Sequence, residues 1–462
     1  MSNSGDRLVR GIKWAVVALI FLPIIIGVIA FVSWRANLGS EVNGKLQAIK
    51  AAGLPTSGEE LNKWYRAVPD SANAALVMTQ AFALVRNFDD SRSNAIASFK
   101  TPSRSEPLSS EDQQLLSAYL KLNEAALAKA GEAAALPQSR YPLDLTCGSY
   151  TLLPHLSKIK ELARLEEYKA LVAARAGNAS EAAACVGNIL GIAQTLDEEP
   201  LLISQLVRIA CLSIACRTLE CILNSTSLGA KDLQKLADSL ATAQEKQPMV
   251  RALVGERAMY APVFRMSWAE IKRMADLGAP ESSAGPARPL PGQSPWLVRA
   301  SGFLERDLNY FLDAIQTNID FARKTFPESL QVTNVNPKIE QEAIRMKFIL
   351  SSMVLPAMNR VIVKEAESQA HLRLAFTAVT VERFRLANKR LPSSLEELAP
   401  KFLSEVPLDP FTGQPLRYKQ LPKGYVIYSL DKDGRDDGGK EKPANRKSTD
   451  RSSYDITFTV ER

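Results

Sequence analysis

The longest run of apolar residues lies near the N-terminus. Residues 14–34 contain no charged side chain, and as a helix they would extend about 31 Å, the thickness of the hydrocarbon core of a bilayer. Lys13 and Arg35 flank the run, and Trp14 and Trp34 occupy its ends, where membrane helices carry aromatic residues. A cleaved signal peptide is the alternative, but its apolar region would be shorter and would end in a small-residue cleavage site. The pattern therefore predicts one transmembrane anchor.

Charges beside this run indicate its orientation. Three basic residues and one acidic residue precede it within residues 1–13, whereas Arg35 and Lys45 are the only basic residues shortly after it. The excess of positive charge before the run favours a cytoplasmic tail at 1–13 and an exported body. In a bacterial cell, this predicts a single-pass inner-membrane protein with a periplasmic, extracytoplasmic body.

Helical periodicity dominates the next 300 residues. Residues 156–226 divide into three helices at Gly177-Asn178 and Glu199-Pro200, and the short connections predict antiparallel neighbours. One hairpin is similar to a tetratricopeptide unit, but three copies at a fixed period are missing. Residues 278–296 carry five prolines and read as a linker or surface loop. We expect a helical body at 36–335.

The pattern changes near the C-terminus. A long helix is predicted from about 338 to 389, and period-two alternation then predicts strands at 424–430, at 455–460 and around Leu416 and Tyr418. Residues 338–462 are thus expected to form an α+β module, a long helix on a small antiparallel sheet. The predicted fold class is mainly α, with an N-terminal transmembrane helix, a body of antiparallel helices and this module.

Composition excludes several classes of protein. The chain has 462 residues, of which 46% are hydrophobic and 23% charged, so it is neither disordered nor collagen-like. Five cysteines are too few for a disulfide scaffold, and Cys211, Cys216 and Cys221 read as buried small hydrophobes. The net charge of +7 comes with no basic run interleaved with aromatics, so no nucleic-acid partner is expected. No nucleotide is expected either, because the glycine-rich stretch 434–440 lacks the Ser or Thr and the strand–loop–helix context of a phosphate loop.

The C-terminal module carries motifs of a known family. The motifs lie at 382–392, 406–418 and 428–434, followed by Gly438-Gly439 and Asp455-Ile456. In order and spacing they resemble the globular region of the type II secretion major pseudopilin and related type IV pilin-like proteins. The family's N-terminal processing site is absent from residues 1–35, so we do not expect processing and polymerisation. The remainder is similar to uncharacterised membrane-anchored bacterial proteins that end in such a module, which implies an architecture and no activity.

An acidic loop at 431–439 is the sharpest candidate site. Closely spaced carboxylates among glycines suit a hard cation such as calcium, which takes six to eight oxygen ligands. The family resemblance implies a calcium site with the following ligands: Asp433, Asp450 or Asp455, and the backbone carbonyls of Leu430 and Arg435. A basic insertion at 440–448 departs from the family pattern. The alternative is a solvated turn, in which Asp and Gly are common.

Three function classes remain open from the sequence. The first is a membrane-tethered structural or interaction protein that binds other envelope components. The second is an accessory of a type II secretion or pilus-like system that contacts pilin-like proteins. The third is an envelope enzyme whose site is assembled from scattered residues. Catalytic motifs of the H-E-x-x-H and G-x-S-x-G kinds are missing, and we expect His155 to be structural and His371 to ligate no metal.

Overall fold

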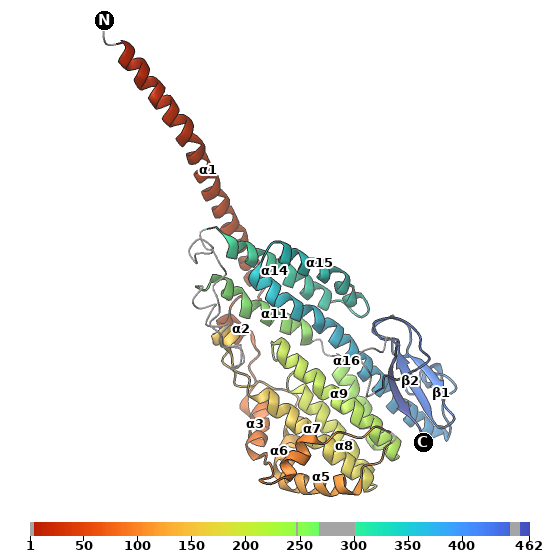
Figure 1. The fold of residues 1–462 in the computed structure, drawn as a ribbon. Helices are drawn as coiled ribbons and strands as arrows, with labels where there is room; N and C mark the ends of the chain where they lie inside the picture. The colour runs from red at the N-terminus through yellow and green to blue at the C-terminus, as the bar shows by residue number, and fades with distance from the viewer. Residues whose placement is uncertain (1–3, 105, 246–247, 268–300, 444–452) are drawn as a thin grey trace.

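The structure is a computed structural model that describes residues 4–104, 106–245, 248–267, 301–443 and 453–462. Helices make up most of it, and one small sheet lies near the C-terminus (Figure 1). The α-helices are α1 (Ser4–Ala51), α2 (Gly58–Trp64), α3 (Ala74–Leu84), α4 (Arg92–Ser98), α5 (Ser110–Leu122), α6 (Glu124–Ala134), α7 (His155–Arg175), α8 (Ala179–Gln194), α9 (Leu202–Ser225), α10 (Ala230–Glu245), α11 (Pro248–Tyr260), α14 (Phe303–Ala322), α15 (Val332–Arg345) and α16 (Ile349–Asn388). The proline-rich stretch 278–296 lies outside the described residues.

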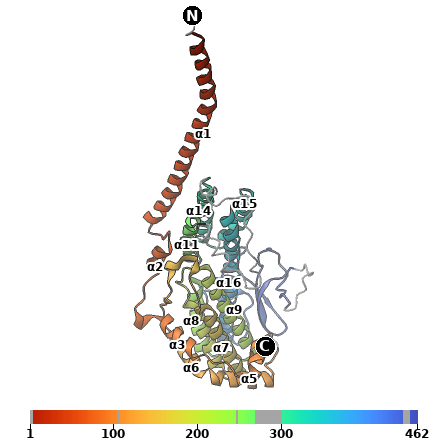
Figure 2. The same cartoon turned by 60° about the vertical axis from the view of Figure 1, so that its left-hand side comes forward.

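Helix α1 confirms the expected anchor as a helix long and apolar enough to cross a membrane. Its large apolar side chains from Leu19 to Trp34 are 41–79% exposed, which is what a lipid-facing surface requires. The C-terminal half of the same helix packs against α14, where Val42 is only 1% exposed. Both views show α1 projecting from the body as one continuous helix, and Figure 2 shows that it is curved (Figures 1 and 2).

The described residues of the body form two large hydrophobic cores. The anchor-side core, which includes Val42, Leu253, Phe311 and Leu355, joins α1, α11, α14 and the first half of α16. The sheet-side core is larger, and it unites α3, α5 to α8, α10 and the sheet. Helices α9 and α16 contribute to both cores. The three helices predicted between 156 and 226 are confirmed as α7, α8 and α9.

In the part of the chain that the structure describes, the sheet has three antiparallel strands in the order β1 (Arg417–Gln420), β2 (Tyr425–Ser429) and β3 (Ile456–Val460). Ile427 in the central strand is level with Tyr418 on one side and Phe458 on the other. The inward side chains of β2 and β3 pack on α16 and belong to the sheet-side core. The expected long helix on a small antiparallel sheet is therefore confirmed, while the pilin-like nature of the module and the domain boundaries stay predictions.

The single long helix expected at 338–389 is wrong in one respect, because it is two helices. Helix α15 ends at Arg345, Lys347 adopts a left-handed conformation with φ 58°, and α16 starts at Ile349. Asp307 of α14 holds this break: its carboxylate accepts hydrogen bonds from the backbone N–H groups of Leu350 at 3.0 Å and Ser351 at 3.2 Å. These are first-turn donors that have no partner within their own helix. A side chain more than 40 residues away thus caps α16.

Candidate functional site

The acidic loop follows β2, and hydrogen bonds to Asp409 fix the position of its first residues. Asp409, which is 1% exposed, accepts hydrogen bonds from the Ser429 hydroxyl and from the Leu430 N–H, both at 2.9 Å. The same carboxylate accepts the N–H of Phe411 at 2.9 Å. Asp409 was not singled out from the sequence, although its Asp-Pro-Phe context marks a turn. Its hydrogen bonds fix the position at which the chain leaves the sheet.

The predicted ligands lie in two places along the loop. Asp433 accepts the Arg435 N–H at 3.1 Å and the Ser453 hydroxyl, and the hydrogen bond from Ser453 lowers the pKa of Asp433. Asp455 is 4% exposed and accepts the Gly439 N–H at 2.8 Å. Asp450 lies outside the described residues. Thus Asp433 and Asp455 both contact the loop backbone, as loop-ordering side chains do.

Carboxylate oxygens without partners distinguish the end of this loop from an ordinary turn. Asp437 and Asp455 each have one buried oxygen with no hydrogen-bond partner in the described part of the chain. Burial raises the pKa of Asp455, and the negative charges of Asp437 and Asp436 raise it further. Two such carboxylates would be stabilised by a cation. Within the described residues, however, no group of three or more His, Cys, Asp or Glu side chains is arranged to hold a metal ion.

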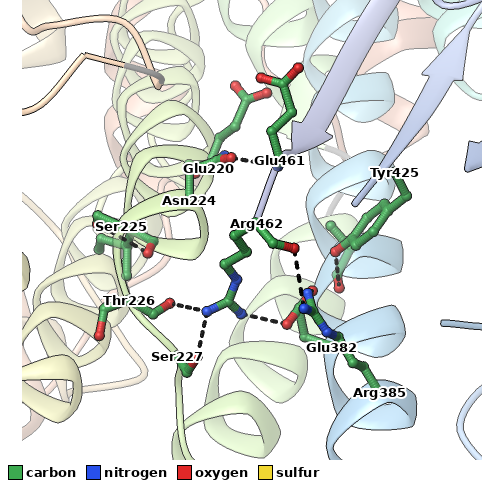
Figure 3. A network of polar contacts seen from close by, with 12 residues as sticks. Glu220, Asn224, Ser225, Thr226, Ser227, Glu382, Arg385, Tyr425, Glu461 and Arg462 are labelled. Carbon is green, nitrogen blue, oxygen red and sulfur yellow. Dashed lines mark hydrogen bonds and ion pairs between the residues drawn. The ribbon is translucent and has the colours of Figure 1, made fainter. Parts of the chain in front are cut away.

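The C-terminal residues seal the module against the helical body (Figure 3). Glu220 and Asn224 of α9 bind the backbone of β3: Glu220 accepts the Thr459 N–H at 2.7 Å, and the Asn224 amide donates to the Thr459 carbonyl at 2.8 Å. Arg462 then donates to the Thr226 carbonyl at 2.6 Å and to Glu382 of α16 at 2.5 Å. The outer edge of β3 is therefore covered by α9, which prevents that edge from pairing with a further strand.

Several carboxylates share one arginine where β3 meets α9. Burial raises the pKa of Glu220 to about 7, against the opposing effects of its hydrogen bond from Thr459 and of the nearby Arg104 guanidinium. Arg104 lies 4.0 Å from Glu220 and 3.5 Å from Glu461, and it also pairs with Glu441 just beyond the acidic loop. One arginine from the body thus links α9, the residue after β3 and the segment just beyond the acidic loop.

A buried polar cluster surrounds His155 and contains a serine, a histidine and a glutamate. The His155 Nε2 atom lies 3.0 Å from both carboxylate oxygens of Glu199, and the Ser204 hydroxyl donates to Glu199 at 2.5 Å. The His155 ring also stacks on Tyr141, with ring centroids 4.3 Å apart. Since the serine and the histidine both bind the glutamate, the histidine does not lie between them as a general base must. The cluster instead joins the start of α7 to the start of α9.

The cysteines are all free, and four of them are buried, including Cys211, Cys216 and Cys221, as expected. Cys147 is exposed. Burial lowers the pKa of His371, which favours its neutral form. These side chains add no reactive group to either site.

Comparisons with known proteins give no match: no family model, no curated protein and no solved structure matches this chain.

Proposed function

We propose that this protein is a single-pass, membrane-anchored structural or interaction protein whose body lies outside the cytoplasm, at the bacterial inner membrane. The observation that carries the proposal is the continuity of α1, which runs unbroken from its exposed apolar half into the half that packs against α14. We call this α1–α14 interface the seam. A membrane segment that continues into a packed helix places the body beside the bilayer with no flexible linker between them.

Polar contacts along the seam support a fixed attachment. Arg35, next to the end of the apolar run, pairs with Glu305 at 2.9 Å, and Lys45 pairs with Asp313 at 2.6 Å. Between them, the Asn309 amide donates to Glu41 at 2.8 Å. Individually such exposed pairs contribute little, about 0–1 kcal/mol each, but their spacing fixes the rotation and register of α1 on α14. The body is thus a platform held in one orientation, which suits the assembly of envelope components.

Co-purification tests this proposal. The full-length chain, crosslinked in whole cells and purified from solubilised membranes, should enrich specific envelope proteins over a bait consisting of residues 1–51 alone. That bait retains the membrane segment and lacks the platform, so it controls for lipid-mediated background. Equal recovery of every protein by the two baits would contradict an interaction role.

A second candidate function is an accessory role in a type II secretion or pilus-like system. The observation that favours it is the helix-on-sheet module, whose β3 edge is occupied by α9 and whose β1 strand lies at the other edge of the sheet. A module closed at one edge would contact pilin-like partners through its remaining surface without polymerising. Enrichment of pilin-like proteins in the same experiment would select this function, and their absence would remove it.

Calcium is the cofactor that we propose for the acidic loop. The buried, unpartnered oxygens of Asp437 and Asp455 support it, because a divalent cation would supply the missing interaction. At free calcium one hundred times the dissociation constant, binding to the folded state alone would add about 2.7 kcal/mol of stability.

Thermal unfolding of the full-length chain in detergent, in chelator and in millimolar calcium, measures this effect. Asp437→Asn should abolish the calcium-dependent rise in melting temperature. Asp436→Asn is the matched control, because Asp436 already pairs with Arg417 at 3.0 Å, and it should retain most of the rise. Identical melting of the unmodified chain with and without calcium would show that the loop is a solvated turn.

A further inference from the structure

A cavity of about 110 Å³ lies between α16, α11 and the turn after α14. Part of its wall is apolar and comes from Met249, Phe326 and Ile362. The rest is polar and includes Ser329, Glu365 and Gln369, which are 2%, 6% and 5% exposed. The cavity is therefore a small space with one apolar side and one polar side.

Three polar atoms on this side of the cavity have no hydrogen-bond partner among the described residues. The Gln369 amide N–H donates a hydrogen bond to one carboxylate oxygen of Glu365 at 3.3 Å. In the described part of the chain, the other Glu365 oxygen, the Gln369 amide oxygen and the Ser329 hydroxyl have no hydrogen-bond partner. A carboxylate and an amide oxygen can only accept hydrogen bonds. Left unpaired, buried groups of this kind are costly, and a buried charge is the costliest.

The two cationic side chains on the lining of the cavity are engaged elsewhere. The Arg373 guanidinium donates to the Leu408 carbonyl, and the Lys324 ammonium lies 4.4 Å from the centre of the Phe321 ring. Among the described residues, neither forms an ion pair with Glu365 within 4.0 Å, whereas Glu367, two residues further along α16, pairs with Lys364 at 2.5 Å. In the part of the chain that the structure describes, the Glu365 carboxylate thus lines the cavity without an ion-pair partner.

We propose that this cavity binds a small organic ammonium ion. A primary ammonium group has three N–H donors and one positive charge, which suits a carboxylate, an amide oxygen and a hydroxyl together. A short alkyl chain attached to it would contact Met249, Phe326 and Ile362. The site is independent of the acidic loop and of the proposed interaction role.

Calorimetric titration of the full-length chain in detergent, in a buffer free of primary amines, tests this site. The probe is n-butylammonium chloride, and tetramethylammonium chloride is the comparison because it has the same charge without N–H donors. We expect the butylammonium ion to bind at least tenfold more tightly than tetramethylammonium. Absence of binding would show that the cavity holds water only, and equal affinity for the two ions would show that the N–H donors are not recognised; either result would overturn the proposal.

A pair of variants locates the binding. Glu365→Gln removes the charge with little change in shape and should weaken butylammonium binding at least tenfold. Glu367→Gln is the matched control on the same helix; its side chain does not line the cavity, so affinity should not change. Unchanged affinity in Glu365→Gln, or equal losses in the two variants, would contradict the assignment. If Glu365→Gln fails to fold, the discrimination between the two ions by the unmodified chain still decides the question.

Discussion

Docking of α1 on the body can be tested at Val42. This side chain is 1% exposed in the anchor-side core, and Leu38 one turn earlier is 8% exposed. Complete burial of a valine or leucine side chain contributes about 1.5–3 kcal/mol, so these two residues supply about 3–6 kcal/mol. The polar contacts of the seam add about 0–1 kcal/mol each. Val42→Asp removes the valine contribution and buries an unpaired charge, which costs several kcal/mol more. We therefore expect Val42→Asp to detach α1 from α14.

Val42→Ala is the matched control. It removes two methyl groups, a loss of about 1.5 kcal/mol, and leaves Leu38 and the ion pairs in place. The helix should remain docked in this variant. The contrast between Ala and Asp separates loss of packing from the introduction of charge.

Electron spin resonance distances between α1 and the body provide the assay. Spin labels at Gln47 on α1 and Lys235 on α10, both exposed positions, report the relative placement of the two helices when exposed Cys147 is replaced by serine. We expect one narrow distance distribution in the parent chain and in Val42→Ala, and a broad distribution in Val42→Asp. A narrow, unchanged distribution in Val42→Asp would show that the docking of α1 on α14 does not depend on burial of Val42.

Two further predictions concern stability, measured by denaturant unfolding of the full-length chain in detergent. Asp307→Ala leaves two first-turn N–H groups of α16 without a partner and should lower the free energy of unfolding by about 2–4 kcal/mol. Ser351→Ala removes one hydroxyl contact to Asp307 and should lower it by about 1 kcal/mol. Equal losses in the two variants would contradict the capping role of Asp307. The raised pKa of Glu220, about 7, means that the folded protein keeps a proton that the unfolded chain loses from about pH 4.5, so stability falls as pH rises through this window. Glu220→Gln should reduce the loss of stability between pH 5 and 7.5 by about 2 kcal/mol. Burial also raises the pKa values of Glu166 and Glu256 to about 7, so these two residues maintain the remaining pH dependence of stability. An identical pH dependence in the variant and the parent chain would show that Glu220 titrates normally.

Local patterns predicted much of this fold because they state which face of an element is buried. The alternation at 455–460 places Phe458 and Val460 in the core, as the structure confirms. The break between α15 and α16 escaped prediction because no glycine or proline marks it, and its cap, Asp307, comes from another helix. A cap supplied through space has no signature in the neighbouring sequence.

The candidate sites also differ in how far the sequence predicts them. The acidic loop was visible because its carboxylates are close together in sequence, although Asp409, which fixes its start, was missed. The cavity at Glu365 was invisible, because a glutamate on a helix ordinarily lies in solvent. Only packing of α16 against residues near 249 and 329 buries this one. Sites built by tertiary contact therefore required the structure.

Labelling of Cys147 determines on which side of the membrane the body lies. Cys147 is exposed and the other four cysteines are buried, so the folded chain carries a single reporter thiol. Its hydrogen bond to Asp144 raises the pKa of the thiol, so labelling with a membrane-impermeant maleimide should be carried out at mildly alkaline pH. We expect one label per chain in intact spheroplasts and none in Cys147→Ser. Labelling of Cys147 only after lysis would place the body in the cytoplasm and contradict the account.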